Sequence, residues 1–132
     1  MGYVIIIAKI KLFMNYKQIV GQFGEAIARN YLIRNGYQIV DSNVKISYKE
    51  IDIIASKGDF TVFIEVKTRT SSILGKADEA FSAKKMRYFK TAIANYIFEK
   101  NINENYVKID LISVDIDKYK KTAKIKHFKD IV

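Results

Sequence analysis

Residues 49–70 read as two β-strands joined by a tight turn, and this hairpin limits the folds that the chain can adopt. The turn falls at residues 57–59, between two runs rich in β-branched and aromatic residues. Because side chains alternate across a strand, Glu65 and Lys67 share one face. Charged groups in such an apolar setting ordinarily need a partner or a ligand. The hairpin therefore predicts a sheet with a polar site built into it.

Asp52 in the first of these strands and Glu65 in the second are candidate metal ligands. Carboxylates are the hard oxygen donors that Mg²⁺ and Mn²⁺ prefer. Lys67 would stand beside the ion, where it could orient a water or neutralise charge on a phosphate. The alternative is a cross-strand ion pair on a solvated face, which would contribute little to stability. The spacing alone does not decide between the two.

The order of these residues resembles a known nuclease signature. Asp52 followed thirteen residues later by Glu65-Val66-Lys67 is similar to the D-(x)n-(D/E)-x-K pattern of the restriction-endonuclease-like superfamily. Together with residues 21–28 and the pieces that follow Lys67, it resembles the small bacterial YraN family (UPF0102). Archaeal Holliday junction resolvases are similar more distantly. The resemblance covers roughly residues 17–132.

The resemblance implies a Mg²⁺- or Mn²⁺-dependent endonuclease that hydrolyses DNA phosphodiester bonds, with branched or junction DNA among its candidate substrates. Asp52, Glu65 and the backbone carbonyl of Val66 would hold the ion, and Lys67 would orient or help to deprotonate the attacking water. Glu25 would complete the acidic cluster; read without the resemblance, it is a first-turn helix carboxylate favoured by the dipole. A resolvase would be a homodimer, because it cuts two strands symmetrically.

Composition agrees with a polyanionic partner. The net charge of +9 and a pI near 9.6 favour nucleic acid, DNA first, or an anionic membrane surface. Candidate phosphate contacts are basic residues after the hairpin and on the next helix: Arg69, Lys84, Lys85 and Arg87. Their alternative is a solvated helix face.

The absence of Cys excludes disulfides and thiolate metal sites. No apolar run is long enough to span a bilayer, so we expect a cytoplasmic protein without a membrane partner.

The remaining patterns predict an α/β fold in the order α-β-β-β-α-β-β. A helix between the third and fourth strands permits a parallel pair in a mixed central sheet flanked by helices. The resemblance implies the restriction-endonuclease-like core specifically. Outside the hairpin, the predicted segments are a helix over 18–35, a strand over 37–44, a helix from a cap near Asp78 to Lys100, a strand over 106–114, a charged turn over 115–121 and a strand over 123–128.

Residues 15–132 are expected to form one domain, preceded by an extension at residues 1–14. The extension is either a strand added to the sheet edge, since β-branched residues dominate it, or a segment upstream of a translation start at Met14. Asp110 and the single histidine, His127, are expected to be structural.

Two further functions stay open beside the nuclease. One is a non-catalytic nucleic-acid-binding module that keeps the nuclease fold, because function belongs to sites rather than folds. The other is a protein that docks onto a partner in DNA processing through exposed aromatic residues.

Overall fold

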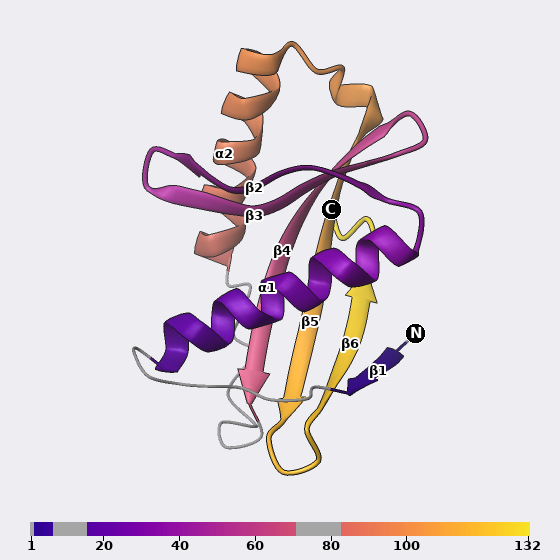
Figure 1. Cartoon of the computed structure of the whole chain (residues 1–132). Helices are drawn as coiled ribbons and strands as arrows, with labels where there is room; N and C mark the ends of the chain where they lie inside the picture. The colour runs from indigo at the N-terminus through magenta and orange to yellow at the C-terminus, as the bar shows by residue number, and fades with distance from the viewer. Residues whose placement is uncertain (1, 7–15, 71–82) are drawn as a thin grey trace.

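The computed structural model describes residues 2–6, 16–70 and 83–132 (Figure 1). The elements, in chain order, are β1 (Gly2–Ile6), α1 (Tyr16–Arg34), β2 (Gln38–Ile46), β3 (Lys49–Lys57), β4 (Phe60–Thr70), α2 (Ala83–Lys100), a short 3-10 helix (Glu104–Tyr106), β5 (Val107–Asp117) and β6 (Thr122–Phe128). This layout confirms the predicted α/β fold, with one more strand at the N-terminus.

The strands form a single mixed sheet in the order β1-β6-β5-β4-β3-β2. Only β4 and β5 run parallel, and α2 lies in the connection between them, as the sequence predicted. The other neighbours are antiparallel. β1 pairs with β6 at the edge, so the first part of the N-terminal extension adds a strand, one of its two predicted alternatives.

The two helices cover opposite faces of the sheet and create two separate cores (Figure 1). Apolar residues of α1 pack on β3 to β6, where Ile53, Ile64 and Ile112 are fully buried. Those of α2, including Phe89, pack on the other face against Phe63. Each strand of the middle of the sheet is therefore buried on both sides, which explains its nearly continuous apolar runs.

Glycines set three local features of the fold. Gly36 has a φ of +87° directly after α1, and Gly58 has a φ of +59° in the hairpin turn, as a stop signal and a tight turn require. Gly24 lies on α1 where a Cβ atom would collide with the side chain of Thr68 on β4. At Gly21, earlier on the same helix, a Cβ atom would meet open space.

The β3–β4 ladder stops partway along both strands. Its pairing runs from Lys57 and Phe60 to Ile53 and Ile64, and no further. Beyond this point β3 continues along β2 as far as Lys49, while β4 continues along β5 to its end. Figure 1 shows the β2–β3 hairpin turning to one side as β4 runs on. We call this divergence the strand fork; Asp52 and Glu65 are the first residues beyond the last pair.

One predicted boundary is wrong. The charged stretch predicted as a turn over 115–121 begins inside β5, which continues to Asp117 in register with β4 and β6. The ladder persists because Asp115 is neutralised by its cross-strand neighbour Arg69, which donates from Nε to Oδ1 at 2.9 Å. The cap predicted near Asp78 lies outside the described residues, and β4 ends at Thr70.

Within the described ranges, none of the helices combines the length and the apolar character that crossing a membrane requires.

Candidate metal centre

Asp52 occupies the strand fork and is almost completely buried, at 9% exposure. Its Oδ2 accepts a hydrogen bond from the backbone N–H of Val66 at 2.8 Å, which joins the two strands where their ladder has ended. Burial raises the pKa of Asp52 to about 8; the charge of Glu65 adds to the rise, and the hydrogen bond from Val66 opposes it. A carboxyl group of this kind binds either a proton or a cation at neutral pH.

Glu65 lies beside Asp52 on β4, with its side chain 18% exposed. Its Oε2 is 3.6 Å from Nζ of Lys49, at the start of β3. Burial raises the pKa of Glu65, while the charge of Lys49, a hydrogen bond from Asp52 and the charge of Lys85 on α2 lower it in part. Its other oxygen, Oε1, is buried and has no hydrogen-bond partner. Such an orphaned oxygen is costly unless a ligand satisfies it.

The backbone of Val66 also faces the fork. In a strand, the N–H and the C=O of one residue point to the same side. Because the N–H of Val66 donates to Asp52, its carbonyl points toward β3 and not toward β5. The carbonyl predicted as the third ligand therefore lies on the Asp52 side of β4.

Lys67 follows on the same face of β4 as Glu65, half-buried and in register with Ser113 of the parallel strand β5. It forms no hydrogen bond or ion pair with any described residue. Oγ of Ser113 is a second buried polar atom without a partner. The face that carries Glu65 and Lys67 thus holds two unsatisfied polar atoms on adjacent strands.

Glu25 reaches the neighbourhood of the centre but not the pair itself. Its Oε1 accepts a hydrogen bond from Nδ2 of Asn43 at 2.7 Å, and the same amide lies 3.4 Å from Oε1 of Glu50. The charge of Glu25 is a minor cause of the raised pKa of Asp52, so the two groups interact electrostatically. Asn43 therefore connects Glu25, which was predicted to complete the acidic cluster, with Glu50 at the start of β3.

The four predicted phosphate contacts divide into two groups. Arg69 is held by Asp115 across the β4–β5 ladder, as described above. Lys84, Lys85 and Arg87 are exposed on the first turns of α2. Lys85 is close enough to lower the pKa of Glu65, and Nζ of Lys84 lies 5.8 Å from the centre of the Tyr88 ring. The start of α2 thus presents positive charge beside the carboxylate pair.

Two contributors were missed from the sequence. Lys49 supplies the cation nearest to Glu65, and Asn43 organises the outer carboxylates. A signal for Lys49 existed, because it precedes a buried run and shares the hairpin with Glu65. No sequence signal marked Asn43, because its φ of +51° inside β2 is a property of the folded backbone.

The donor set fits a hard divalent cation. It consists of two adjacent carboxylates, one of which has an oxygen without a hydrogen-bond partner, and the backbone carbonyl of Val66 on the same side of β4. In the described ranges no cluster of three or more His, Cys, Asp or Glu side chains is arranged to hold a metal ion. An ion at Asp52 and Glu65 would therefore keep several waters, as Mg²⁺ commonly does.

Asp110 and His127 form a different cluster, on the face that α1 covers. Nε2 of His127 lies 2.7 Å from Oδ2 of Asp110, and Nδ1 lies 2.9 Å from the hydroxyl of Tyr31. The backbone N–H of Asp130 donates to the other oxygen of Asp110 at 2.8 Å. Both side chains are 3% exposed, so this network joins α1, β5 and β6 as a structural element, which agrees with the prediction.

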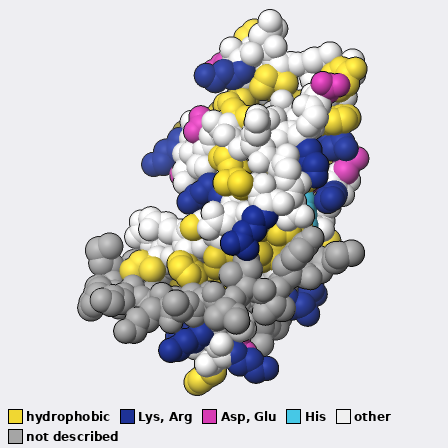
Figure 2. Space-filling view, turned by 45° about the vertical axis from the view of Figure 1, so that its right-hand side comes forward, with side chains coloured by type: hydrophobic (Ala, Val, Ile, Leu, Met, Phe, Trp, Pro, Cys, Tyr) yellow, Lys and Arg dark blue, Asp and Glu magenta, His cyan; other side chains and the backbone are white. Residues whose placement is uncertain are grey.

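Positive side chains are spread over the surface and are not confined to the centre. Figure 2 shows Lys and Arg at several heights of one face, with Asp and Glu at fewer places. This distribution suits a long polyanion that contacts the protein at many points.

Comparison with known proteins identifies relatives of similar length. The family model described as uncharacterised protein family UPF0102 matches residues 24–114. A UPF0102 protein of Clostridium tetani is 39% identical over 117 residues, which is 88% of this chain and 95% of the relative. One of Caldicellulosiruptor bescii is 37% identical over 118 residues, 89% of this chain and 98% of the relative. One of Clostridium botulinum is 41% identical over 113 residues, 84% of this chain and 91% of the relative.

Proposed function

This chain belongs to the UPF0102 family, and we propose that it is a divalent-metal-dependent endonuclease that hydrolyses DNA phosphodiester bonds. The observation that carries the proposal is the pairing of Asp52 with Glu65 at the strand fork. Two buried carboxylates with raised pKa values, one of them with an orphaned oxygen, are stabilised by a shared cation.

Asp52, Glu65 and the carbonyl of Val66 would hold Mg²⁺ or Mn²⁺. When bound there, the ion would supply the positive charge that activates water and screens the phosphate. The hydrogen bond from Val66 fixes Asp52 in position, and the β4–β5 ladder fixes Glu65 and Lys67 on one rigid strand. Rigid placement of this kind is what in-line attack on a phosphodiester needs.

Lys67 is the group assigned to the attacking water. Because it has no partner among the described residues, its ammonium is available to orient a water or to neutralise a phosphate oxygen. Lys84, Lys85 and Arg87 would hold the flanking phosphates, which positions the substrate without reading its sequence. The net charge of +9 would draw DNA to this surface from a distance.

A non-catalytic nucleic-acid-binding module is the second candidate function. One observation favours it: Lys49 already gives Glu65 a cationic partner without any metal. In that case the same basic surface would bind nucleic acid and leave it intact. Under the nuclease assignment we also propose that the protein is a homodimer in the cytoplasm, with branched or junction DNA among its substrates.

The test is incubation with branched, linear and single-stranded DNAs, with EDTA, Mg²⁺ or Mn²⁺. The nuclease proposal predicts cleavage only with a divalent ion, and none by Asp52→Asn, which keeps an acceptor for the Val66 N–H. A Lys124→Ala variant, altered at an exposed lysine of β6, should cut normally. DNA binding without cleavage of any substrate would instead support the non-catalytic module. Binding of that kind would weaken steeply as the salt concentration rises.

A further inference from the structure

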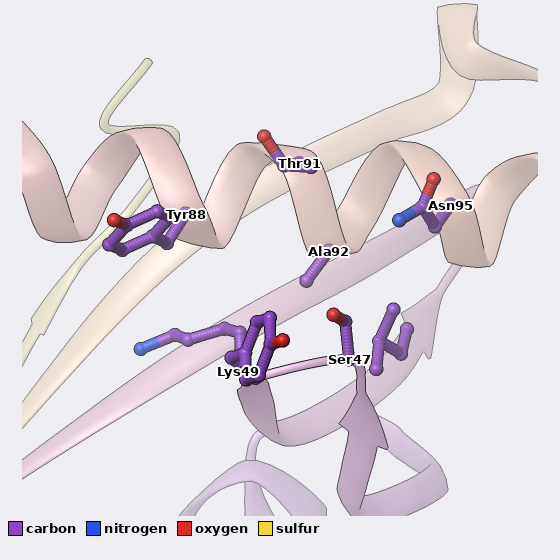
Figure 3. Close-up of a pocket in the computed structure, with 8 residues that line it drawn as sticks. Ser47, Lys49, Tyr88, Thr91, Ala92 and Asn95 are labelled. Atoms are coloured by element: carbon purple, nitrogen blue, oxygen red, sulfur yellow. The ribbon is translucent and has the colours of Figure 1, made fainter.

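A cavity of about 400 Å³ opens between the β2–β3 turn and α2, with Ala92 and Lys49 among the residues that line it. Figure 3 shows Ala92 extending from α2 toward the turn, with Ser47 and Lys49 opposite it. This volume lies within the range of pockets that take small organic ligands, about 300–1,000 Å³. The cavity lies outside the metal centre described above.

Two exposed tyrosines border this cavity. Tyr48, at the tip of the turn, is completely exposed, and Tyr88 on α2 is 54% exposed. Neither ring is needed to fill a core, since the neighbouring positions Phe89 and Ala92 are the ones buried under α2. Exposed aromatic rings with lysines nearby, here Lys49 and Lys84, are platforms on which unpaired nucleobases stack.

Lys49 connects the cavity to the metal centre. Its side chain lines the cavity, while its Nζ is the cation 3.6 Å from Oε2 of Glu65. The backbone phosphate of a nucleotide whose base is held in the cavity would therefore be separated from the carboxylate pair by about the length of one lysine side chain. Lys84, whose Nζ lies 5.8 Å from the centre of the Tyr88 ring, adds positive charge beside that ring.

Polar groups complete the lining. Ser47, Thr91 and Asn95 border the otherwise apolar space. Thr91 donates its hydroxyl to the carbonyl of Arg87 within α2, whereas the Asn95 amide has no partner among the described residues. An apolar slot with an unoccupied amide at its edge suits the flat face and polar edge of a nucleobase.

We propose that this cavity binds an unpaired nucleobase, so that the substrate class is DNA with a single-stranded segment beside the cut, such as a flap or a fork. A base inside a continuous duplex is stacked and paired, and would have to leave the helix to enter. This inference rests on the proposed nuclease function for its meaning, but its binding step is measurable without cleavage.

The experiment uses the full chain in EDTA, so that no cutting occurs. The probes are a flap DNA with 2-aminopurine in its single-stranded arm and a blunt duplex of equal length, with binding followed by fluorescence. The Tyr48→Ala, Tyr88→Ala double variant should lose about tenfold or more in flap affinity, because each stacked base contributes a factor of this order. Its affinity for the blunt duplex should change less than about twofold.

Tyr119→Ala is the matched control, because Tyr119 is 92% exposed on the β5–β6 turn, away from the cavity. It should bind both DNAs as the unaltered protein does. Tyr48→Phe with Tyr88→Phe should keep flap binding, since stacking does not need the hydroxyls. Because both tyrosines are exposed, thermal unfolding of all variants should coincide and exclude loss of folding.

Equal affinity for flap and duplex, or an unchanged flap affinity in the double alanine variant, would overturn the inference. Either result leaves the nuclease proposal intact if metal-dependent cleavage is seen. Conversely, if no DNA is cleaved but the tyrosine variants selectively lose flap binding, the cavity assignment stands and the nuclease proposal fails.

Discussion

The backbone N–H of Val66 donates to Oδ2 of Asp52 at 2.8 Å, at the point where β3 and β4 cease to pair. This single hydrogen bond links β3 to β4 where the ladder between them has ended. It also fixes the position of the Asp52 carboxylate. Beyond the fork each strand stays paired on its outer side, β3 with β2 and β4 with β5, so Asp52 and Glu65 both lie on strands held in a ladder.

Removal of the Lys67 ammonium should affect the reaction and not the binding of DNA. If the proposed function holds, Lys67→Ala should lower the cleavage rate at saturating DNA by about 10²–10⁴-fold, the usual contribution of a group that assists proton transfer. Affinity for DNA should change only a few fold, because one lysine of many is lost. Single-turnover kinetics separates the two, and an equal loss in rate for Lys124→Ala would contradict the assignment.

The stability of the metal-free protein should depend on Asp52. Its folded pKa of about 8 lies above the ordinary aspartate value, so the folded state retains a proton that the unfolded state releases first. The stabilising contribution of this group is fully present below about pH 4 and is lost as pH rises through about 8.

In Asp52→Asn, the free energy of unfolding should therefore fall less steeply as pH rises between these values. At pH 8.5 in EDTA the variant should be more stable than the unaltered protein by about 1–3 kcal/mol, since one pKa unit corresponds to about 1.4 kcal/mol. Urea unfolding at pH 5 and pH 8.5 measures the difference. Asp59→Asn, at the exposed hairpin turn, is the control; parallel curves for Asp52→Asn and Asp59→Asn would contradict the raised pKa.

Two glycines of α1 should respond in opposite directions to the same substitution. Gly24→Ala places a methyl group against the Thr68 side chain and should destabilise the protein by about 1–3 kcal/mol. Gly21→Ala has open space around the new atom and should stabilise the helix by about 0.5–1 kcal/mol. Denaturant unfolding tests both, and a stabilising Gly24→Ala would show that α1 and β4 are further apart than described.

The buried network beneath α1 should matter for stability alone. Asp110→Asn weakens the interaction with His127, and the loss should be about 1–3 kcal/mol. Tyr31→Phe should cost less, about 1 kcal/mol, because it removes one neutral hydrogen bond. Below the unfolding temperature neither variant should alter metal-dependent cleavage, and a selective loss of activity would instead give this cluster a role in the reaction.

The sequence predicted the layers of the fold because their signals are local. The period of apolar residues, the stop at Gly36 and the turn at Gly58 each depend on a few neighbouring residues. The parallel pair followed from a helix placed between two strands. The end of β5 was misjudged because Asp115 and Asp117 look like turn residues until the partner strand is known; Arg69 makes the first of them compatible with a ladder.

The residues of the candidate site could be named from the sequence, but their geometry could not be derived from it. Strand alternation correctly placed Glu65 and Lys67 on one face, yet nothing in either apolar run marks where the ladder ends. The association of Lys49 with Glu65, and of Asn43 with Glu25, depends on a hairpin that bends away from its neighbour. Contacts across such a fork are long-range, so they are visible only in the folded chain.

The most direct measurement is titration of the protein with Mn²⁺ by isothermal calorimetry at pH 8, with Asp52→Asn and Lys124→Ala alongside. The account predicts saturable binding to the unaltered protein and to Lys124→Ala, with release of protons because the carboxyl pair exchanges a proton for the ion. It predicts no such binding to Asp52→Asn. Absence of Mn²⁺ uptake by the unaltered protein, or equal uptake by Asp52→Asn, would contradict a metal centre at the strand fork.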